Sequence, residues 1–216
     1  IRFSTFYAQS VSSPSRVSLL TGQNAARHRT TNWINAESNN PTTYGPTAWN
    51  WQGLTTADPI YPALLKAAGY KTIHVGKAHF GCIGSEGEDP TRLGFEVNIA
   101  GHAGGGPATY LSEQNYGHRR DGEANSPFAI PDLQTYWGTG TFLTEALTRE
   151  AVKALDKAKK YGQPFFLNMA HYAVHIPIDR DMRFFAKYVR KGMSDKEAAY
   201  ASLIEGMDKS LGDLVQ

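Results

Sequence analysis

Three short polar clusters in the sequence contain residues that could bind and attack an anion. A serine hydroxyl can act as a nucleophile, Arg and Lys carry positive charge, and imidazole rings transfer protons near neutral pH. The clusters are Ser12 with Arg16, Lys77 with His79, and His171 with His175. If the fold brings these clusters together, their positive charge would bind the anion and stabilise charge that develops during the attack.

The first cluster lies between a predicted strand and a predicted helix. Residues 1–7 alternate in polarity as a strand does. The next segment predicts a helix that begins near Ser12, is capped by the Ser13 side chain and ends at Gly22. Free N–H groups at the start of this helix favour negative charge, and Arg16 lies about one turn inside it.

The other two clusters follow predicted strands. Residues 70–75 form one strand, and residues 165–170 form a second that is apolar enough to be buried on both faces. The last helix begins with a capping box at Ser194 and Glu197. The other predicted elements are helices over residues 59–68 and 143–160, and long loops over residues 23–58 and 81–140. Alternating strands and helices indicate an α/β fold, in which ligands bind at the carboxyl ends of strands.

Composition excludes several classes of protein. The 216 residues contain 22 Lys and Arg against 20 Asp and Glu, a net charge of +2, which argues against binding to nucleic acid or acidic membranes through bulk charge. No apolar run approaches the roughly 18–20 residues of a membrane span. The single cysteine, Cys82, excludes an intrachain disulfide framework and a Cys-rich zinc site. No signal peptide is visible at Ile1, and both ends are expected to be cut within a longer protein.

Some histidines and glycines have a structural interpretation. His74 alternates with apolar residues on a strand and is expected to be packed or at the surface rather than catalytic. His171 and His175 have H-x-x-x-H spacing, but no Glu follows the first, so a zinc site is not expected and His171 is interpreted as structural. The glycine-rich residues 101–106 do not match a nucleotide-binding motif.

The predicted loop over residues 23–58 contains Trp33, Trp49 and Trp51. A loop of this length is uncommon unless it is functional. The indole rings either stack on sugar rings or brace the loop, and both interpretations remain open.

Two segments closely resemble the signatures of the sulfatase family. Residues 12–22, S-S-P-S-R-V-S-L-L-T-G, match the first signature, and residues 69–79, G-Y-K-T-I-H-V-G-K-A-H, match the second. The resemblance extends to residues 164–167, to residues 175–177 (H-I-P) and to the helix over 200–212. It implies an α/β fold like that of alkaline phosphatase, with a mixed sheet flanked by helices. Residues 1–216 would then be part of the N-terminal catalytic domain, without its first strand and its C-terminal portion.

The resemblance also implies the hydrolysis of sulfate esters. In this family the residue at the position of Ser12 is oxidised to formylglycine by a maturation enzyme, and Ser rather than Cys resembles the bacterial type matured without oxygen. A hydrated aldehyde can expel sulfate, which an ordinary hydroxyl cannot readily do. The implied substrate is a sulfated glycan or an aryl sulfate, and the implied location is periplasmic or secreted.

The matched positions imply a role for each site residue. Arg16 orients the diol, Lys77 bridges the diol and a sulfate oxygen, and His79 assists the collapse of the diol. His175 holds the sulfate and protonates the leaving oxygen. The family also uses a divalent cation, usually Ca²⁺, for which oxidised Ser12 is the only expected ligand within this chain.

Two alternatives remain open. The first is a phosphoester or phosphonate ester hydrolase of the same superfamily, in which Ser12 or its oxidised form attacks phosphorus. The second is a catalytically inactive fragment or binding module.

Overall fold

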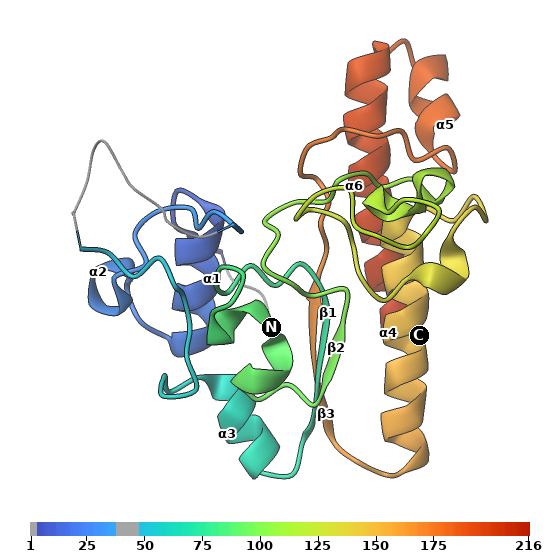
Figure 1. Ribbon diagram of the computed structural model, residues 1–216. Helices are drawn as coiled ribbons and strands as arrows, with labels where there is room; N and C mark the ends of the chain where they lie inside the picture. The colour runs from blue at the N-terminus through green and yellow to red at the C-terminus, as the bar shows by residue number, and fades with distance from the viewer. Residues whose placement is uncertain (1–3, 38–47) are drawn as a thin grey trace.

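A computed structural model describes residues 4–37 and 48–216, and the described strands form one parallel sheet between two helical layers (Figure 1). The strand order is β2-β1-β3, with β1 (Lys71–Gly76) between β2 (Val97–Ile99) and β3 (Phe165–Ala170). The predicted α/β fold with helices flanking a sheet is confirmed. All strands in the described residues run parallel, so their carboxyl ends meet at one edge.

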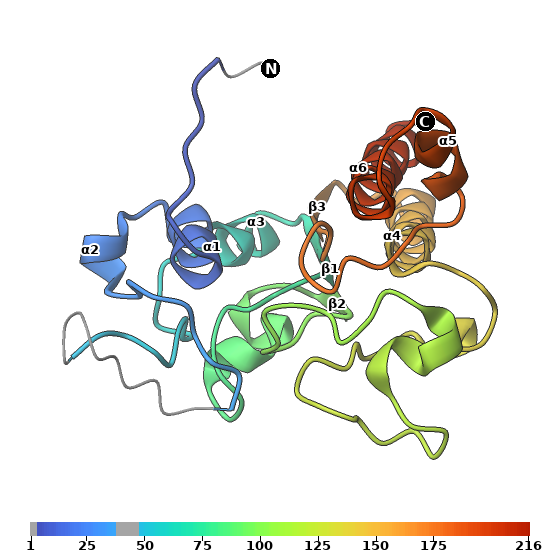
Figure 2. The same ribbon diagram turned by 90° about the horizontal axis from the view of Figure 1, so that it is seen from above.

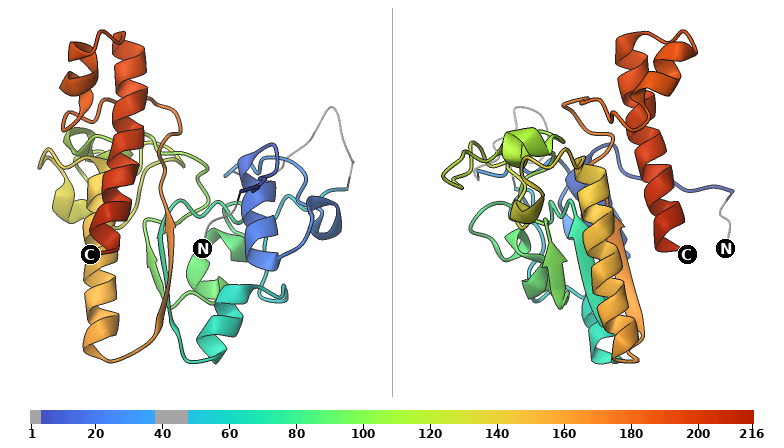
Figure 3. Two further views of the ribbon diagram at one scale, coloured as in Figure 1. Left: turned by 180° about the vertical axis from the view of Figure 1, so that it is seen from behind. Right: turned by 90° about the vertical axis from the view of Figure 1, so that its right-hand side faces the viewer.

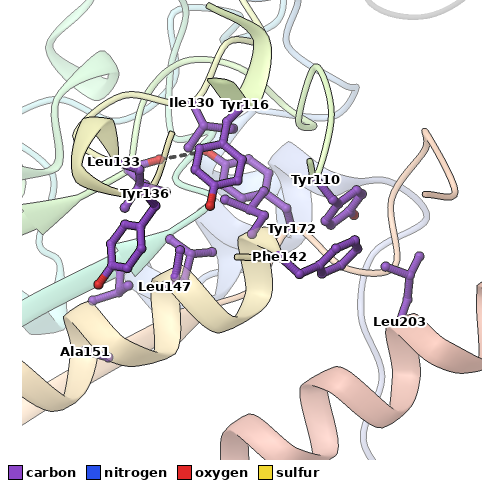
Figure 4. Close-up of a cluster of buried hydrophobic side chains, with 14 of the residues drawn as sticks. Tyr110, Tyr116, Ile130, Leu133, Tyr136, Phe142, Leu147, Ala151, Tyr172 and Leu203 are labelled. Carbon is purple, nitrogen blue, oxygen red and sulfur yellow. Dashed lines mark hydrogen bonds between the residues drawn. The ribbon is translucent and has the colours of Figure 1, made fainter. Parts of the chain in front are cut away.

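One face of the sheet is covered by α4 (Leu143–Lys160), which contacts all three strands. The helix α6 (Asp195–Leu214) packs on α4, and α5 (Phe185–Arg190) packs on α6 (Figure 3). Buried aromatic and aliphatic side chains fill the space beside α4 (Figure 4). These include Tyr110, Tyr116, Ile130, Leu133, Tyr136, Phe142, Leu147 and Tyr172. Their burial fixes the sheet against α4.

The other helical layer contains α1 (Ser12–Thr21), α2 (Ala25–His28) and α3 (Tyr61–Ala67). Figure 2 shows this layer on the opposite side of the sheet from α4 and α6. A second buried cluster joins it to the sheet through Val17 and Leu20 of α1, with Phe80 and Phe95 from the segments that follow β1. Short 3-10 helices complete the connections: η1 (Glu86–Glu88), η2 (Pro90–Leu93), η3 (Ser112–Gly117) and η4 (Gln134–Tyr136). No helix within the two described ranges is long and apolar enough to cross a membrane.

Several predicted elements are confirmed. The helix expected over residues 143–160 is α4, and the capping box of Ser194 and Glu197 begins α6. The left-handed conformation of Gly22, with φ of 65°, ends α1.

Two predictions for the N-terminal region are wrong. Residues 4–7, the described part of the predicted opening strand, form no strand, and Phe6 and Tyr7 are exposed because the segment extends away from the sheet (Figure 2). Ser13 does not cap α1. Its side chain is fully buried and accepts a hydrogen bond from the N–H of Ile34 at 3.0 Å, so it is used inside the molecule. Residues 38–47 of the predicted loop lie outside the described residues.

Two further predictions are corrected. The strand expected to be buried, β3, is only partly buried, because within the described residues it pairs with β1 alone and its other edge carries no strand. The predicted loop over residues 81–140 contributes β2 and much of the core beside α4. A three-residue strand is too short to show alternation, and the buried tyrosines of this region follow no helical or strand period.

Candidate active site

The site forms where β1 and β3 end side by side. Lys77 follows β1, and its N–H donates to the carbonyl of Ala170, the last residue of β3, at 2.7 Å. Gly76 has φ of 96°, and a Cβ there would overlap the Ala170 carbonyl. Glycine therefore permits this close approach, which directs Lys77 and the segment after β3 toward one place.

Ser12 and His79 form the centre of the site. The Ser12 Oγ lies 3.0 Å from His79 Nδ1, and His79 Nε2 lies 2.8 Å from the carbonyl oxygen of Ile34. A carbonyl only accepts, so Nε2 carries the hydrogen and Nδ1 accepts the Ser12 hydroxyl proton in a hydrogen bond. Burial lowers the pKa of His79 to about 3, so its ring is neutral. A hydroxyl that donates to a neutral imidazole has the arrangement of a nucleophile and its base.

The surroundings hold the His79 ring from several sides. The side chain is fully buried, the Ser13 hydroxyl lies 3.2 Å from Nε2, and the Trp33 ring meets the imidazole edge-on with centroids 5.9 Å apart. The backbone of His79 has φ of 54°, a conformation that costs energy in a residue with a side chain. Such strain persists where the surrounding structure fixes the residue, which is common at functional sites.

Arg16 contacts Ser12, and Lys77 lies next to Arg16. Arg16 Nε donates to the Ser12 Oγ at 3.2 Å, and Arg16 Nη1 donates to the Lys77 carbonyl at 2.7 Å. Burial lowers the pKa of Arg16 to about 10. Burial, together with the charge of Arg16, lowers the pKa of Lys77 to about 7.

Neither Arg16 nor Lys77 has a carboxylate partner in the part of the chain that the structure describes. Lys77 is only 5% exposed, yet among residues 4–37 and 48–216 no carboxylate forms an ion pair with Lys77 or Arg16. Unpaired buried charge is costly. The N-terminus of α1 adds partial positive charge at Ser12, so the arrangement is complementary to an anion.

His175 lies at the edge of the same site. Its Nδ1 lies 2.8 Å from the Ile176 carbonyl and therefore donates to it, which leaves Nε2 as the nitrogen open to a ligand. The Tyr110 hydroxyl donates to the His175 carbonyl at 2.9 Å. The residue is exposed, as a group that meets substrate must be.

The remaining histidines of the predicted clusters have other surroundings. His74 is packed, as expected: its Nε2 lies 3.0 Å from the Gly76 carbonyl and its Nδ1 lies 3.0 Å from the Asn168 amide nitrogen. Burial lowers its pKa to about 3, so a neutral ring satisfies both partners. His171 is partly buried, and burial lowers its pKa to about 4.

The described residues do not by themselves fit a calcium site. No three His, Cys, Asp or Glu side chains in the two described ranges gather closely enough to hold a metal ion. Arg16 donates to Ser12 and to the carbonyl of Lys77, so two side chains that carry positive charge lie in this region and repel a cation. Calcium requires several oxygen ligands, chiefly carboxylates, and the described residues offer no such cluster here.

A cavity of about 500 Å³ opens next to Ser12. Ser12 and Arg16 line it from α1, and Asn168, Met169 and Ala170 line it from β3. The Ser12 side of the site is therefore accessible from the end of β3.

The sequence predicted one site made of Ser12, Arg16, Lys77, His79 and His175. It did not predict which residues hold these side chains in place. Ser13 and the Ile34 carbonyl fix His79, and the glycines of residues 104–106 lie against the histidine rings. The density of glycine in that segment was a visible signal, because glycine permits close packing as well as unusual turns.

Comparison with known proteins identifies the family of the chain. The profile of the sulfatase family matches residues 1–216. The chain is 29% identical to N-acetylgalactosamine-6-sulfatase of Mus musculus, over 99% of the chain and 39% of the relative. It is 26% identical to the uncharacterized sulfatase YdeN of Escherichia coli (strain K12), over 94% of the chain and 35% of the relative.

Solved structures share the fold. The chain resembles Ps i-CgsB in its complex with k-i-k-neocarrahexaose, with a TM-score of 0.74 and 24% identity over 96% of this chain and 44% of that one. This likeness supports the alkaline-phosphatase-like fold. The chain spans less than half the length of these similar proteins.

Proposed function

The chain belongs to the sulfatase family, and on that basis we propose that it is part of the N-terminal catalytic domain of a sulfate ester hydrolase. The observation that carries the proposal is the pair of buried cations beside the hydrogen-bonded Ser12 and His79. A sulfate group supplies the negative charge that Arg16 and Lys77 lack among the described residues. Its binding at the start of α1 would place sulfur next to the Ser12 position.

Oxidation of Ser12 to formylglycine would supply the chemistry that a serine lacks. A hydrated aldehyde can attack sulfur with one hydroxyl and expel sulfate when the other loses its proton. His79 Nδ1 is placed to accept a proton at this position, because its Nε2 is already committed to Ile34. Arg16 donates to the oxygen of residue 12 and so stabilises negative charge on it.

His175 is the proposed acid. When the S–O bond to the leaving group breaks, the leaving oxygen needs a proton, which a protonated His175 can donate from Nε2. Its hydrogen bond from Nδ1 to the Ile176 carbonyl fixes the ring orientation for that transfer. Lys77, whose charge is not offset by a carboxylate in the described structure, would stabilise the sulfuryl oxygens.

The finer features of the enzyme are also part of the proposal. A calcium ion would bind at residue 12 with oxygen ligands from outside the described residues. A maturation enzyme of the oxygen-independent bacterial type would oxidise Ser12, and the enzyme would act in the periplasm or outside the cell.

The proposed substrate is a sulfated carbohydrate, and Trp33 supports it. Trp49 is buried with Ile34 and Cys82, so this indole braces the segment. Trp33 is 38% exposed and lies against His79, within reach of a leaving group bound at the site. A sugar ring can stack on such an exposed indole.

A phosphate ester hydrolase is the second candidate. The hydrogen bond between the unmodified Ser12 hydroxyl and neutral His79 favours it, because this pair could attack phosphorus directly. The cations would bind phosphate as well as sulfate.

Two measurements decide between the candidates. Mass spectrometry of the peptide over residues 3–16, from full-length protein produced with its maturation enzyme, should show the loss of two hydrogens at Ser12. The mature protein should cleave aryl sulfates and sulfated oligosaccharides faster than matched phosphate esters, and Ser12→Ala should abolish turnover. A preference for phosphate with unmodified Ser12 supports the second candidate. No turnover of either ester class by the mature protein supports the binding module.

A further inference from the structure

Each glycine in residues 101–106 lies against a different imidazole ring. A Cβ built on any of them would approach a ring carbon within 2.6 Å, closer than non-bonded atoms can lie. The pairs are Gly101 with His74, Gly104 with His102, Gly105 with His79, and Gly106 with His175.

Backbone conformation does not explain these glycines. Gly104, Gly105 and Gly106 do not have positive φ, unlike Gly22 and other turn glycines of the chain. An alanine could therefore adopt their backbone geometry. At Gly105 and Gly106 the three atoms nearest to an added Cβ all belong to the histidine ring, whereas Gly104 also faces the Pro127 carbonyl oxygen at 2.7 Å.

Two of these contacts involve the proposed active site. A Cβ on Gly105 would lie 2.6 Å from Cε1 and 3.0 Å from Nδ1 of His79, the nitrogen that faces Ser12. A Cβ on Gly106 would lie 2.5 Å from Nδ1 of His175, the nitrogen that donates to Ile176. An added methyl group would thus displace each ring at the nitrogen that sets its orientation.

The two contacts are made by adjacent residues. Consecutive Cα atoms are about 3.8 Å apart, so one peptide unit lies against both rings. His79 comes from the segment after β1 and His175 from the segment after β3, and among the described residues their rings form no hydrogen bond with each other. The adjacent residues Gly105 and Gly106 therefore place one stretch of backbone against both rings.

We propose that Gly105 and Gly106 are positioning residues that fix the base His79 and the acid His175 relative to each other. The inference rests on the proposed function for the roles of the histidines, but the packing itself does not depend on the substrate. Replacement by alanine should move the ring by a fraction of an ångström to an ångström, and misplacement by about 1 Å can cost on the order of a hundredfold in rate.

The first test measures kinetics of the mature full-length protein. G106A should lower kcat about tenfold to a hundredfold with a smaller change in KM, because the substrate anion is held by Arg16 and Lys77. The matched control is G212A, since Gly212 lies on α6 with open space around it, and its kinetics should match the unchanged protein. Unchanged kinetics in G106A would overturn the proposal.

A double-mutant cycle tests whether the glycine acts through the ring. In H175A the ring is absent, so adding G106A should cause no further loss. If the two losses multiply, Gly106 acts through something other than His175 and the positioning role is wrong.

Gly105 requires a folding control because His79 is buried. G105A should lower the melting temperature of the unchanged protein, but it should cause little further loss when it is added to H79A, since the ring with which the methyl group clashes is then absent. A loss that persists without the ring would contradict the proposal.

NMR of histidines labelled with ¹³C at Cε1 provides a direct readout of the two rings. G105A should shift the His79 signal more than any other histidine signal, and G106A should shift the His175 signal most. The NMR shifts do not depend on whether the substrate is a sulfate or a phosphate ester. The positioning role of the glycines can therefore be tested even if the proposed function is wrong.

Discussion

Two arginine clusters in the described part of the chain, at Arg183 and at Arg16, differ in their partners. Asp181 is fully buried and holds Arg183 through two hydrogen bonds of 2.9 and 2.6 Å, and Glu145 lies 3.1 Å from the same guanidinium. Burial lowers the pKa of Arg183, but hydrogen bonding and the charge of Asp181 outweigh it, so the net shift is upward. Arg16 has no carboxylate partner within the described residues, and burial lowers its pKa to about 10.

This difference separates a structural ion pair from a binding site. The α5–α6 region neutralises its arginine within the chain, so that charge contributes to folding. The region beside Ser12 leaves Arg16 and Lys77 without a carboxylate partner among the described residues, which costs folding energy that binding of an anion, as proposed above, would compensate. The predictions below test this contrast, beginning with the largest expected effect.

Removal of a cation from the Ser12 region should affect turnover most. Lys77→Ala should lower kcat for a sulfate ester by about 10²–10³, because a charge that stabilises the transition state is lost. The exposed Lys66 on α3 provides the control, and Lys66→Ala should leave kcat unchanged. Steady-state kinetics of the mature protein measure both, and near-normal turnover in Lys77→Ala would remove this residue from the site.

Removal of the anion from the paired region should instead affect stability. Asp181→Ala should lower the free energy of unfolding by about 3 kcal/mol, because Arg183 loses its closest partner in a partly buried position. Urea titration measures the change. The value of kcat at a temperature where the variant is folded should remain unchanged, and a large loss of kcat would show that the two regions are coupled.

The pH dependence of anion binding should sharpen the contrast. Lys77 has a pKa of about 7, so it loses its charge as pH rises through 7. The affinity for inorganic sulfate should fall above this pH by up to about tenfold per unit. Calorimetry in buffers of different ionisation enthalpy should detect proton uptake on binding near pH 7, and Lys77→Ala should abolish it. A pH-independent affinity from pH 6 to 9 would contradict the assignment.

The same shift predicts how stability depends on pH. The ordinary pKa of lysine is 10.5, above the folded value of about 7, so the unfolded chain binds more protons between these values. The contribution of Lys77 to stability should therefore rise with pH from about 7 to 10.5.

An exposed ion pair should matter least. Lys209 and Asp213 on α6 pair at 2.6 Å, but their side chains are 50% and 40% exposed. Lys209→Ala should change the free energy of unfolding by less than about 0.5 kcal/mol in urea titration. A larger loss would mean that solvent exposure does not make the Lys209–Asp213 ion pair weaker than the Asp181–Arg183 pair.

Patterns within short stretches of the sequence predicted the helices that have a clear apolar period or a capping motif. The period of residues 143–160 predicted α4 with its observed bounds, and the spacing of Ser194 and Glu197 predicted the start of α6. The signals failed where structure depends on distant partners. β2 needs β1 beside it, and residues 4–7 lack a strand neighbour in the described structure.

The sequence by itself determined which chemical groups are available and which family signatures contain them. Only the tertiary structure decided what each group does. Ser13 turns inward to His79 instead of capping α1, and Gly105 packs on the same ring. The two residues in each of these contacts are 26 to 66 positions apart in the sequence. The fold likewise decides which groups surround Arg16, where no described carboxylate is its partner. Burial and neighbouring charge set the protonation of His79 and Lys77, and both are properties of the packed chain that no local pattern of residues contains.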